Sequence, residues 1–105
     1  MLYLVTCEGK IGYPMPPEEW LELVLRHMDD ILKYKQQGKV VVHGAPVGQQ
    51  AGYMIWDVDS NKELQTLVTR LPAWPFMEWE IVPLISTEDT IESIKQNLAS
   101  VRASK

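Results

Sequence analysis

The strand-like segments of this sequence carry apolar side chains on both of their faces, and this feature restricts the possible folds more than any other. In residues 2–7, for example, Leu4 lies on one face and Val5 on the other, and residues 53–58 and 76–85 show the same two-sided pattern. An antiparallel sheet that helices cover on one side only alternates apolar with polar residues instead. We therefore expect a sheet that is covered on both faces.

Proline, glycine and capping signals divide the chain into four strands and three helices. Pro16 and Pro17 open the first helix and Gly38 ends it, a capping box at residues 60–63 opens the second, and Thr87 is expected to cap the third. Pro83 indicates an edge position or a bulge for the last strand. The expected elements are strands 2–7, 40–43, 53–58 and 76–85 and helices 18–37, 61–71 and 87–103.

This order is β-α-β-β-α-β with an extra C-terminal helix, which predicts a ferredoxin-like α+β fold with an antiparallel sheet. We expect one domain over residues 1–105, with the ferredoxin-like core at about 1–85 and the C-terminal helix at about 87–103. The two helices of that core lie on one face of the sheet. A second copy of the chain is the simplest cover for the other face, so a homodimer is expected. The last helix, with an apolar stripe that includes Leu98, would be free to embrace the partner.

Composition excludes several classes of protein. The formal net charge is −4 and no Lys/Arg block is longer than two residues, so nucleic-acid binding is not expected. Cys7 is the only cysteine, which rules out an intramolecular disulfide and a cysteine-based zinc cluster. We expect no membrane span, because no apolar run reaches ~18 residues. The strand-like start gives no signal-peptide pattern, and a cytoplasmic protein is therefore expected.

The stretch from Ile55 to Leu84 resembles the muconolactone isomerase family. The matching pieces are Trp-Asp-Val-Asp-Ser-Asn at 56–61, Leu-Pro-Ala-Trp-Pro-Phe-Met at 71–77 and Val-Pro-Leu at 82–84, with Met-Pro-Pro-Glu-Glu at 15–19 upstream. This resemblance implies a dimeric α/β barrel, usually assembled into larger rings. It also implies an isomerase of aromatic hydrocarbon catabolism that converts muconolactone to an enol-lactone without metal or organic cofactor.

The resemblance also bears on individual positions of the first helix and second strand. Glu22 and Arg26 keep charged positions of the family and are candidate substrate-binding residues, with a surface ion pair as the alternative. Residues 40–42 are three valines, where the family pattern is rich in Arg, His and Trp. In the first helix, a position that is usually acidic in the family is occupied by His27 in this chain. These departures leave the substrate open.

Two histidines are the candidate catalytic bases. His27 falls inside the apolar stripe of the first helix, where burial would tune its pKa, and the alternative is a core histidine with one hydrogen bond. His43 ends the second strand before a Gly-Pro break and is either a base at a pocket mouth or a solvent-exposed edge residue. The histidines lack metal-ligand spacing, so no metal is expected.

Aromatic residues, chiefly Tyr53 and Trp56, are candidates for the walls of a cavity that holds a flat, small-molecule ligand; core packing and the subunit interface are the alternatives. Tyr13, in the Pro/Gly-rich loop, either closes over a pocket mouth or is a simple exposed loop tyrosine.

Three candidate functions follow for this sequence. The first is a cofactor-free isomerase that moves a proton on a small lactone or cyclic acid. The second is a non-catalytic small-molecule-binding or accessory oligomeric protein of the same fold. The third is a haem-binding or monooxygenase-type dimeric barrel.

Overall fold

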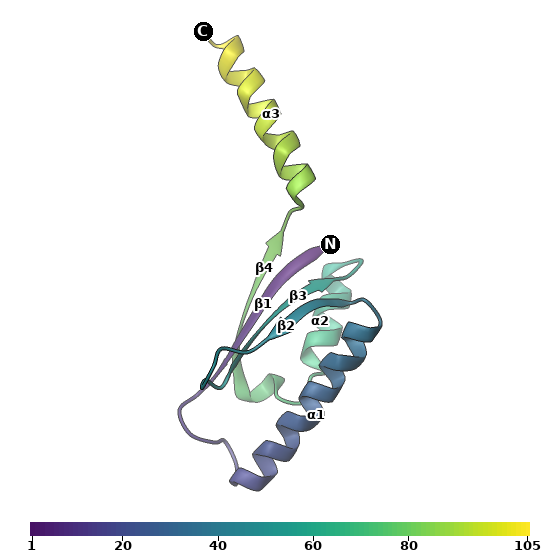
Figure 1. Cartoon of the computed structure of the whole chain (residues 1–105), viewed down its shortest axis with the longest axis vertical. Helices are drawn as coiled ribbons and strands as arrows, with labels where there is room; N and C mark the ends of the chain where they lie inside the picture. The colour runs from purple at the N-terminus through teal and green to yellow at the C-terminus, as the bar shows by residue number, and fades with distance from the viewer.

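A computed structural model describes all 105 residues of the chain. Its core consists of four strands and two helices, followed by a third helix that projects from the body (Figure 1). The elements are β1 (Leu2–Gly9), α1 (Pro17–Gln36), β2 (Val40–Gly44), β3 (Ala51–Asp57), α2 (Asn61–Thr69), the 3₁₀ turn η1 (Trp74–Phe76), β4 (Met77–Leu84) and α3 (Thr87–Ala103).

The four strands form one antiparallel sheet in the order β2-β3-β1-β4. This order confirms the ferredoxin-like α+β fold. It also places β4, which contains Pro83, at an edge of the sheet, where a missing backbone N–H does not interrupt a ladder. None of the helices is long and apolar enough to cross a membrane.

One face of the sheet packs against α1 and α2 and forms the hydrophobic core. The fully buried side chains there include Val5 of β1, Met54 and Trp56 of β3, and Ile31 of α1. Trp20, His27 and Ile31 recur at helical spacing along α1, so one side of that helix turns toward the sheet. The prediction that His27 lies on the sheet-facing side of the first helix is therefore confirmed, whereas Leu21 and Leu32, which were part of the same predicted apolar spacing, are 52% and 54% exposed.

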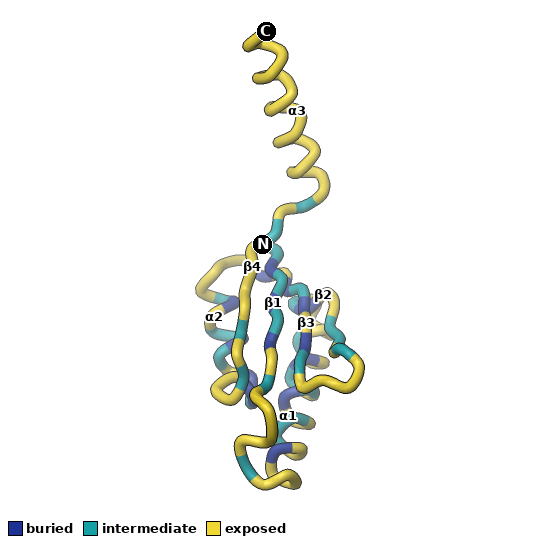
Figure 2. The backbone as a smooth tube through the Cα atoms, turned by 90° about the vertical axis from the view of Figure 1, so that its left-hand side faces the viewer, coloured by how far each residue is buried: buried dark blue, intermediate teal, exposed yellow.

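The opposite face of the sheet has no helix over it (Figure 2). Cross-strand pairing brings Val42, Ile55, Leu4 and Val82 into one apolar row that crosses all four strands. Val82 and Val42 are 38% and 42% exposed. The two-sided apolar pattern is thus present in the folded chain, with one side open to solvent.

Two helix boundaries differ from the prediction. Ser86, not Thr87, caps α3, because its Oγ accepts a hydrogen bond from the backbone N–H of Asp89 at 3.0 Å. Helix α2 ends at Thr69 rather than Leu71. The chain then turns into η1, and Leu71 packs into the core from this connection.

A β-bulge in β2 changes the direction of its side chains. Val40 pairs with Trp56 and Val42 pairs with Ile55, so Val41 is an extra residue between two consecutive partners. Val40 faces the core, Val42 then lies on the open face, and His43 returns to the helix-covered face opposite Met54. If Val41 were paired in regular alternation instead of bulged, His43 would lie on the open face.

Candidate active site

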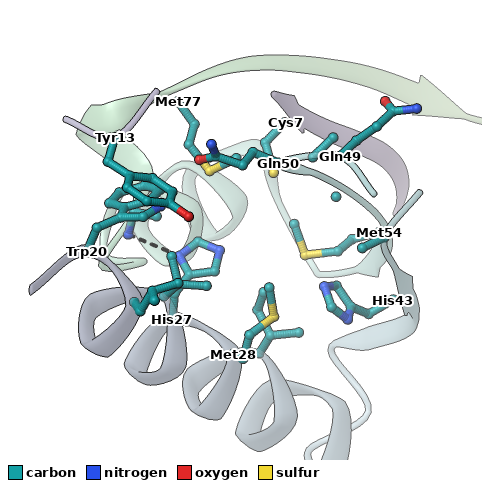
Figure 3. A pocket seen from close by; sticks show the side chains of 17 residues that line it. Cys7, Tyr13, Trp20, His27, Met28, His43, Gln49, Gln50, Met54 and Met77 are labelled. Atoms are coloured by element: carbon teal, nitrogen blue, oxygen red, sulfur yellow. Dashed lines mark hydrogen bonds between the residues drawn. The ribbon is translucent and has the colours of Figure 1, made fainter. Parts of the chain in front are cut away.

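A small cavity lies between α1 and the helix-covered face of the sheet (Figure 3). Its volume is about 220 Å³, which is below the range typical of drug-sized ligands and suits a single small ring. The lining is mostly apolar, and no Asp, Glu, Lys or Arg side chain contributes to it. Both predicted histidines line this cavity, together with Cys7, Tyr13, Trp20, Val24, Met28, Gln49, Gln50, Met54 and Met77.

His27 is buried, with 3% of its surface exposed, and is held by one backbone contact. Its Nδ1 accepts a hydrogen bond from the N–H of Ala73 at 3.0 Å. Burial, and then the nearby His43, lower the pKa of His27 to about 4, whereas Asp30 acts in the opposite direction. The ring is therefore neutral at neutral pH, and because Nδ1 is an acceptor, the proton of the neutral ring is on Nε2.

His43 differs from His27 in having no hydrogen-bond partner within the chain. It reaches the cavity from the end of β2, where the bulge turns it toward Met54. Burial, and then the charge of Lys35, lower its pKa. His43 is therefore also neutral at neutral pH and has a free nitrogen lone pair. Figure 3 shows the two imidazoles in the same cavity, with Met28 and Met54 drawn between them.

The polar groups at the edge of the cavity come from two loops. Tyr13 belongs to the loop before α1, and Gln49 and Gln50 belong to the loop between β2 and β3. The Gln50 amide donates to the carbonyl of Gly12 at 3.3 Å and so connects the two loops. Tyr13 was expected either to close over the pocket mouth or to be an exposed loop tyrosine. It combines both features, because it lines the cavity and is 48% exposed.

The two imidazoles give the cavity groups that can accept and donate a proton. No group of three or more His, Cys, Asp or Glu side chains is placed to hold a metal ion. Burial raises the pKa of the Cys7 thiol to about 11, so this side chain stays protonated and is a poor nucleophile. The cavity thus presents one free imidazole lone pair and one imidazole N–H to a bound molecule.

Comparison with known proteins assigns the family. The sequence model of the muconolactone delta-isomerase family matches residues 1–89. This chain belongs to that family. The muconolactone Delta-isomerase of Cupriavidus pinatubonensis is 32% identical over 91 residues, which cover 87% of this chain and 99% of the relative. Muconolactone Delta-isomerase 1 of Acinetobacter lwoffii is 34% identical over 84 residues, 80% of this chain and 88% of the relative.

Two solved structures support the muconolactone isomerase-like fold. A crystal structure of muconolactone isomerase superimposes with a TM-score of 0.74 at 24% identity, covering 82% of this chain and 90% of that one. A 5-chloro-2-hydroxyhydroquinone dehydrochlorinase of Burkholderia phenoliruptrix, solved with 2,5-dihydroxybenzoquinone, gives a TM-score of 0.63 at 16% identity, covering 85% and 98%. At these identities the likeness concerns the fold.

The other predicted site residues of this family member lie outside the cavity. Glu22 and Arg26 are on the outer side of α1 and do not line it. Trp56 is fully buried in the core, where its ring lies 5.4 Å from that of Tyr34. Tyr53 lies on the open face of the sheet, with its ring across Gly44 of the neighbouring strand. The structure therefore brings together His27 and His43 but none of these four residues.

Several lining residues gave no functional signal in the sequence. Met28 belongs to the apolar stripe of α1 and was indistinguishable there from a core residue. Gln49 and Gln50 are loop residues without a motif, and their role depends on how the β2–β3 loop folds toward Gly12. The partner of His27, the Ala73 N–H, is 46 residues away in sequence.

Proposed function

We propose that this chain is a cofactor-free isomerase that moves a proton on a small lactone or cyclic acid, with muconolactone as the first substrate to test. The two relatives are named muconolactone Delta-isomerases, and the family model matches most of the chain. The observation that carries the proposal is the pair of neutral imidazoles in one small apolar cavity, one with a free lone pair and the other with a fixed N–H.

His43 is the general base of this proposal. A base needs an unprotonated nitrogen within reach of the bound substrate. His43 lines the cavity, has no hydrogen-bond partner in the chain, and has a lowered pKa. It is therefore unprotonated at neutral pH, at the cost of being a weaker base than an exposed histidine.

His27 has the other role, that of a hydrogen-bond donor. Its Nδ1 is occupied by the Ala73 N–H, so the neutral ring offers Nε2–H rather than a lone pair. A neutral imidazole that donates to a developing enolate oxygen is a known catalytic arrangement. Both histidines were candidate bases on sequence grounds, and the hydrogen bond to Ala73 is the reason that we now assign them different roles.

The reaction needs no redox change. His43 removes a proton from the saturated carbon at the far end of the substrate's conjugated C=C–C=O system, and the electron pair moves through the double bond onto the carbonyl oxygen as a dienolate. His27 donates to that oxygen and lowers the energy of the charge. The protonated His43 returns the proton to the carbon next to the carbonyl, which shifts the double bond, conserves the atoms of the substrate and regenerates the base.

The substrate's carboxylate has no cationic partner inside the cavity of one chain. We place it at the mouth, where the Tyr13 hydroxyl and the amides of Gln49 and Gln50 are available. Arg26 and Glu22, which match charged family positions, remain proposed substrate contacts only if substrate or a partner chain approaches that side of α1. Tyr53 and Trp56 support the site through the sheet and the core.

The proposal includes assembly and location. The apolar row on the open sheet face supports a homodimer in which two sheets face each other, and larger homo-oligomers can be built from such dimers. We expect no nucleic-acid partner. A cytoplasmic location is part of the proposal and agrees with a single unpaired cysteine, Cys7, which stays a free thiol there.

The test is an assay of purified protein on muconolactone that follows enol-lactone formation for wild type and three variants. His43→Ala should lower kcat by about 10²–10⁴, the usual contribution of a general base. His27→Leu should lower kcat by about 10²–10³, the usual loss for one oxyanion donor. His27→Gln places an amide N–H near the position of Nε2 and should recover part of the activity that Leu loses.

The outcomes separate the candidate functions. Turnover that collapses in His43→Ala supports the isomerase. Turnover that is unchanged in both histidine variants contradicts the assigned roles. A well-folded wild-type protein without turnover removes muconolactone as the substrate, and tight binding of small cyclic acids without conversion would then favour the non-catalytic binding protein.

A further inference from the structure

A proline-rich turn, residues 71–76, connects α2 to β4 and contains η1. Two backbone hydrogen bonds close it. The N–H of Trp74 donates to the carbonyl of Leu71 at 2.9 Å, and the N–H of Phe76 donates to the carbonyl of Ala73 at 3.1 Å. Two residues of the turn are prolines, which have a fixed φ, so the turn has little freedom to change its shape.

Ala73 lies in the middle of this turn and directs its N–H at the imidazole of His27. Ala73 is 1% exposed, and its N–H donates to Nδ1 of His27 at 3.0 Å. Neither of the two hydrogen bonds that close the turn uses this N–H. A buried N–H without an acceptor is costly, so the turn and the imidazole satisfy each other. The position of the turn therefore determines which nitrogen of the neutral ring carries the proton.

Three contacts hold the turn against the rest of the fold. Leu71 is buried in the hydrophobic core. The ring of Phe76 meets the ring of Trp20 of α1 edge to face, with their centroids 6.0 Å apart. The indole N–H of Trp79, in β4, donates to the carbonyl of Trp74 at 2.9 Å. Of these three contacts the hydrogen bond is the most directional, and it fixes the orientation of the turn.

Trp79 contacts both the turn and the imidazole that the turn holds. Its ring lies 6.2 Å from that of His27, at an interplanar angle of 40°, and it packs against the hydrophobic core. Trp79 does not line the cavity. A residue in this place can therefore influence proton transfer only through His27.

We propose that Trp79 is a positioning residue for His27 and that the turn connects the two. The indole N–H holds the turn, the turn holds the Ala73 N–H on Nδ1, and the proton of the neutral ring is thereby kept on Nε2. Without the indole N–H the turn is free to shift, and the ring can adopt the tautomer with its proton on Nδ1. That tautomer presents a lone pair to the substrate oxygen in place of a donor. The inference rests on the donor role of His27 in the proposed function.

Another tryptophan of the core supplies a matched comparison. Trp56 of β3 is fully buried, and its indole N–H has no hydrogen-bond partner in the chain. Replacing either Trp56 or Trp79 with phenylalanine removes an indole N–H and leaves a smaller ring at the same core. Of the two substitutions, only that of Trp79 breaks a hydrogen bond to the turn. The pair therefore separates loss of the hydrogen bond from loss of packing.

The experiment is nitrogen NMR of the histidine rings in the isotope-labelled full chain at neutral pH. In wild type, Nδ1 of His27 should have the shift of an unprotonated nitrogen and Nε2 that of a protonated one. Trp79→Phe should move the two shifts toward each other, because the two tautomers then exchange. Trp56→Phe should lower the melting temperature, since it leaves a cavity, but should keep the wild-type shifts of His27. Wild-type shifts in Trp79→Phe would overturn the proposal.

An isosteric replacement makes the test independent of ring size. Benzothienylalanine, incorporated in place of Trp79, has a sulfur atom where the indole has its N–H and nearly the same shape as tryptophan. It should give the same change in the His27 shifts as Trp79→Phe, in a chain that keeps the wild-type packing. If this chain shows the wild-type shifts, ring packing alone places His27 and the proposal is wrong.

Turnover of muconolactone gives a second readout. Trp79→Phe should lower kcat by about twofold to tenfold, the usual effect of one neutral hydrogen bond. KM should be nearly unchanged, because Trp79 does not reach the cavity. Shifts that move while kcat stays constant would contradict the role of this tautomer in the reaction. A wild-type chain without turnover contradicts the proposed reaction, and the NMR shifts still decide whether Trp79 positions the ring.

Discussion

The most consequential residue-scale feature is the neutral, buried His27. Its Nδ1 receives the Ala73 N–H, its ring lies 6.2 Å from that of Trp79, and it sits at the wall of the cavity. These contacts favour the uncharged ring and oppose the protonation that an exposed histidine undergoes near pH 6.5. The hydrogen bond from Ala73 fixes the tautomer, and burial, which lowers the pKa of His27, makes the folded state sensitive to acid.

We expect the free energy of unfolding to decrease as the pH falls from about 6.5 to 4. The pKa of His27 is about 4 in the folded chain, below its ordinary value of 6.5. The unfolded chain therefore binds the proton first, and the stabilisation that is fully present above pH 6.5 declines below it, by roughly 3 kcal/mol. Urea unfolding at several pH values measures this dependence.

The control for this prediction is His27→Asn, in which the amide oxygen can still accept from the Ala73 N–H but no group titrates. This variant should show a flatter dependence between pH 6.5 and 4. Equal slopes in wild type and variant would show that other groups cause the acid sensitivity.

His43 is expected to determine how kcat/KM depends on pH. Because His43 acts as a base only when unprotonated, and its pKa is below the ordinary value of 6.5, kcat/KM should stay constant at neutral pH. It should fall only as the pH drops below 6.5. The profile of His27→Gln should keep this acid limb. Loss of the limb in His27→Gln would instead identify His27 as the titrating base.

At the scale of elements, sequence periodicity predicted most of what positions the site. The helical spacing of Trp20, His27 and Ile31 predicted that His27 faces the sheet, and the structure confirms it. The direction of His43 was not predictable, because three consecutive valines give no signal for a bulge. Trp56 was a candidate for the cavity wall, but it lies in the packed core. Apolar alternation predicts that a residue faces the core, but it does not predict whether a cavity lies beside that residue.

The bulge at Val41 provides an element-scale prediction. Deleting Val41 should remove the bulge and leave Val42 opposite Ile55 and His43 opposite Met54, so His43 should stay on the helix-covered face of the sheet. We expect the deletion variant to keep most of its kcat, in contrast to the loss of about 10²–10⁴ in His43→Ala. Val41→Ala keeps the extra residue and should also retain most of the activity. A loss in the deletion variant as large as that in His43→Ala would show that the bulge itself is needed to direct His43 into the cavity.

At the scale of the whole molecule, the cavity and the open sheet face lie on opposite sides of the same four strands. The helix-covered face holds the imidazoles, whereas the open face holds the apolar row and, toward one end, Glu8 opposite Glu78. Sequence alternation predicted both faces. It could not predict the projection of α3, because an apolar stripe indicates that a helix packs but not against what.

The last prediction concerns the open face. Leu4 lies in the middle of the apolar row, paired with Ile55 and Val82. If two sheets face each other, Leu4→Lys buries an unpaired charge, which is strongly unfavourable, and should shift the protein to a smaller assembly. The isolated chain should still fold, because Leu4 lies outside the core formed with α1 and α2.

Light scattering measures the mass of the assembly, and circular dichroism shows whether the variant is folded. Gln65→Lys, on the exposed side of α2, is the control and should leave the mass unchanged. A Leu4→Lys protein with the wild-type mass would show that the open face is not the interface.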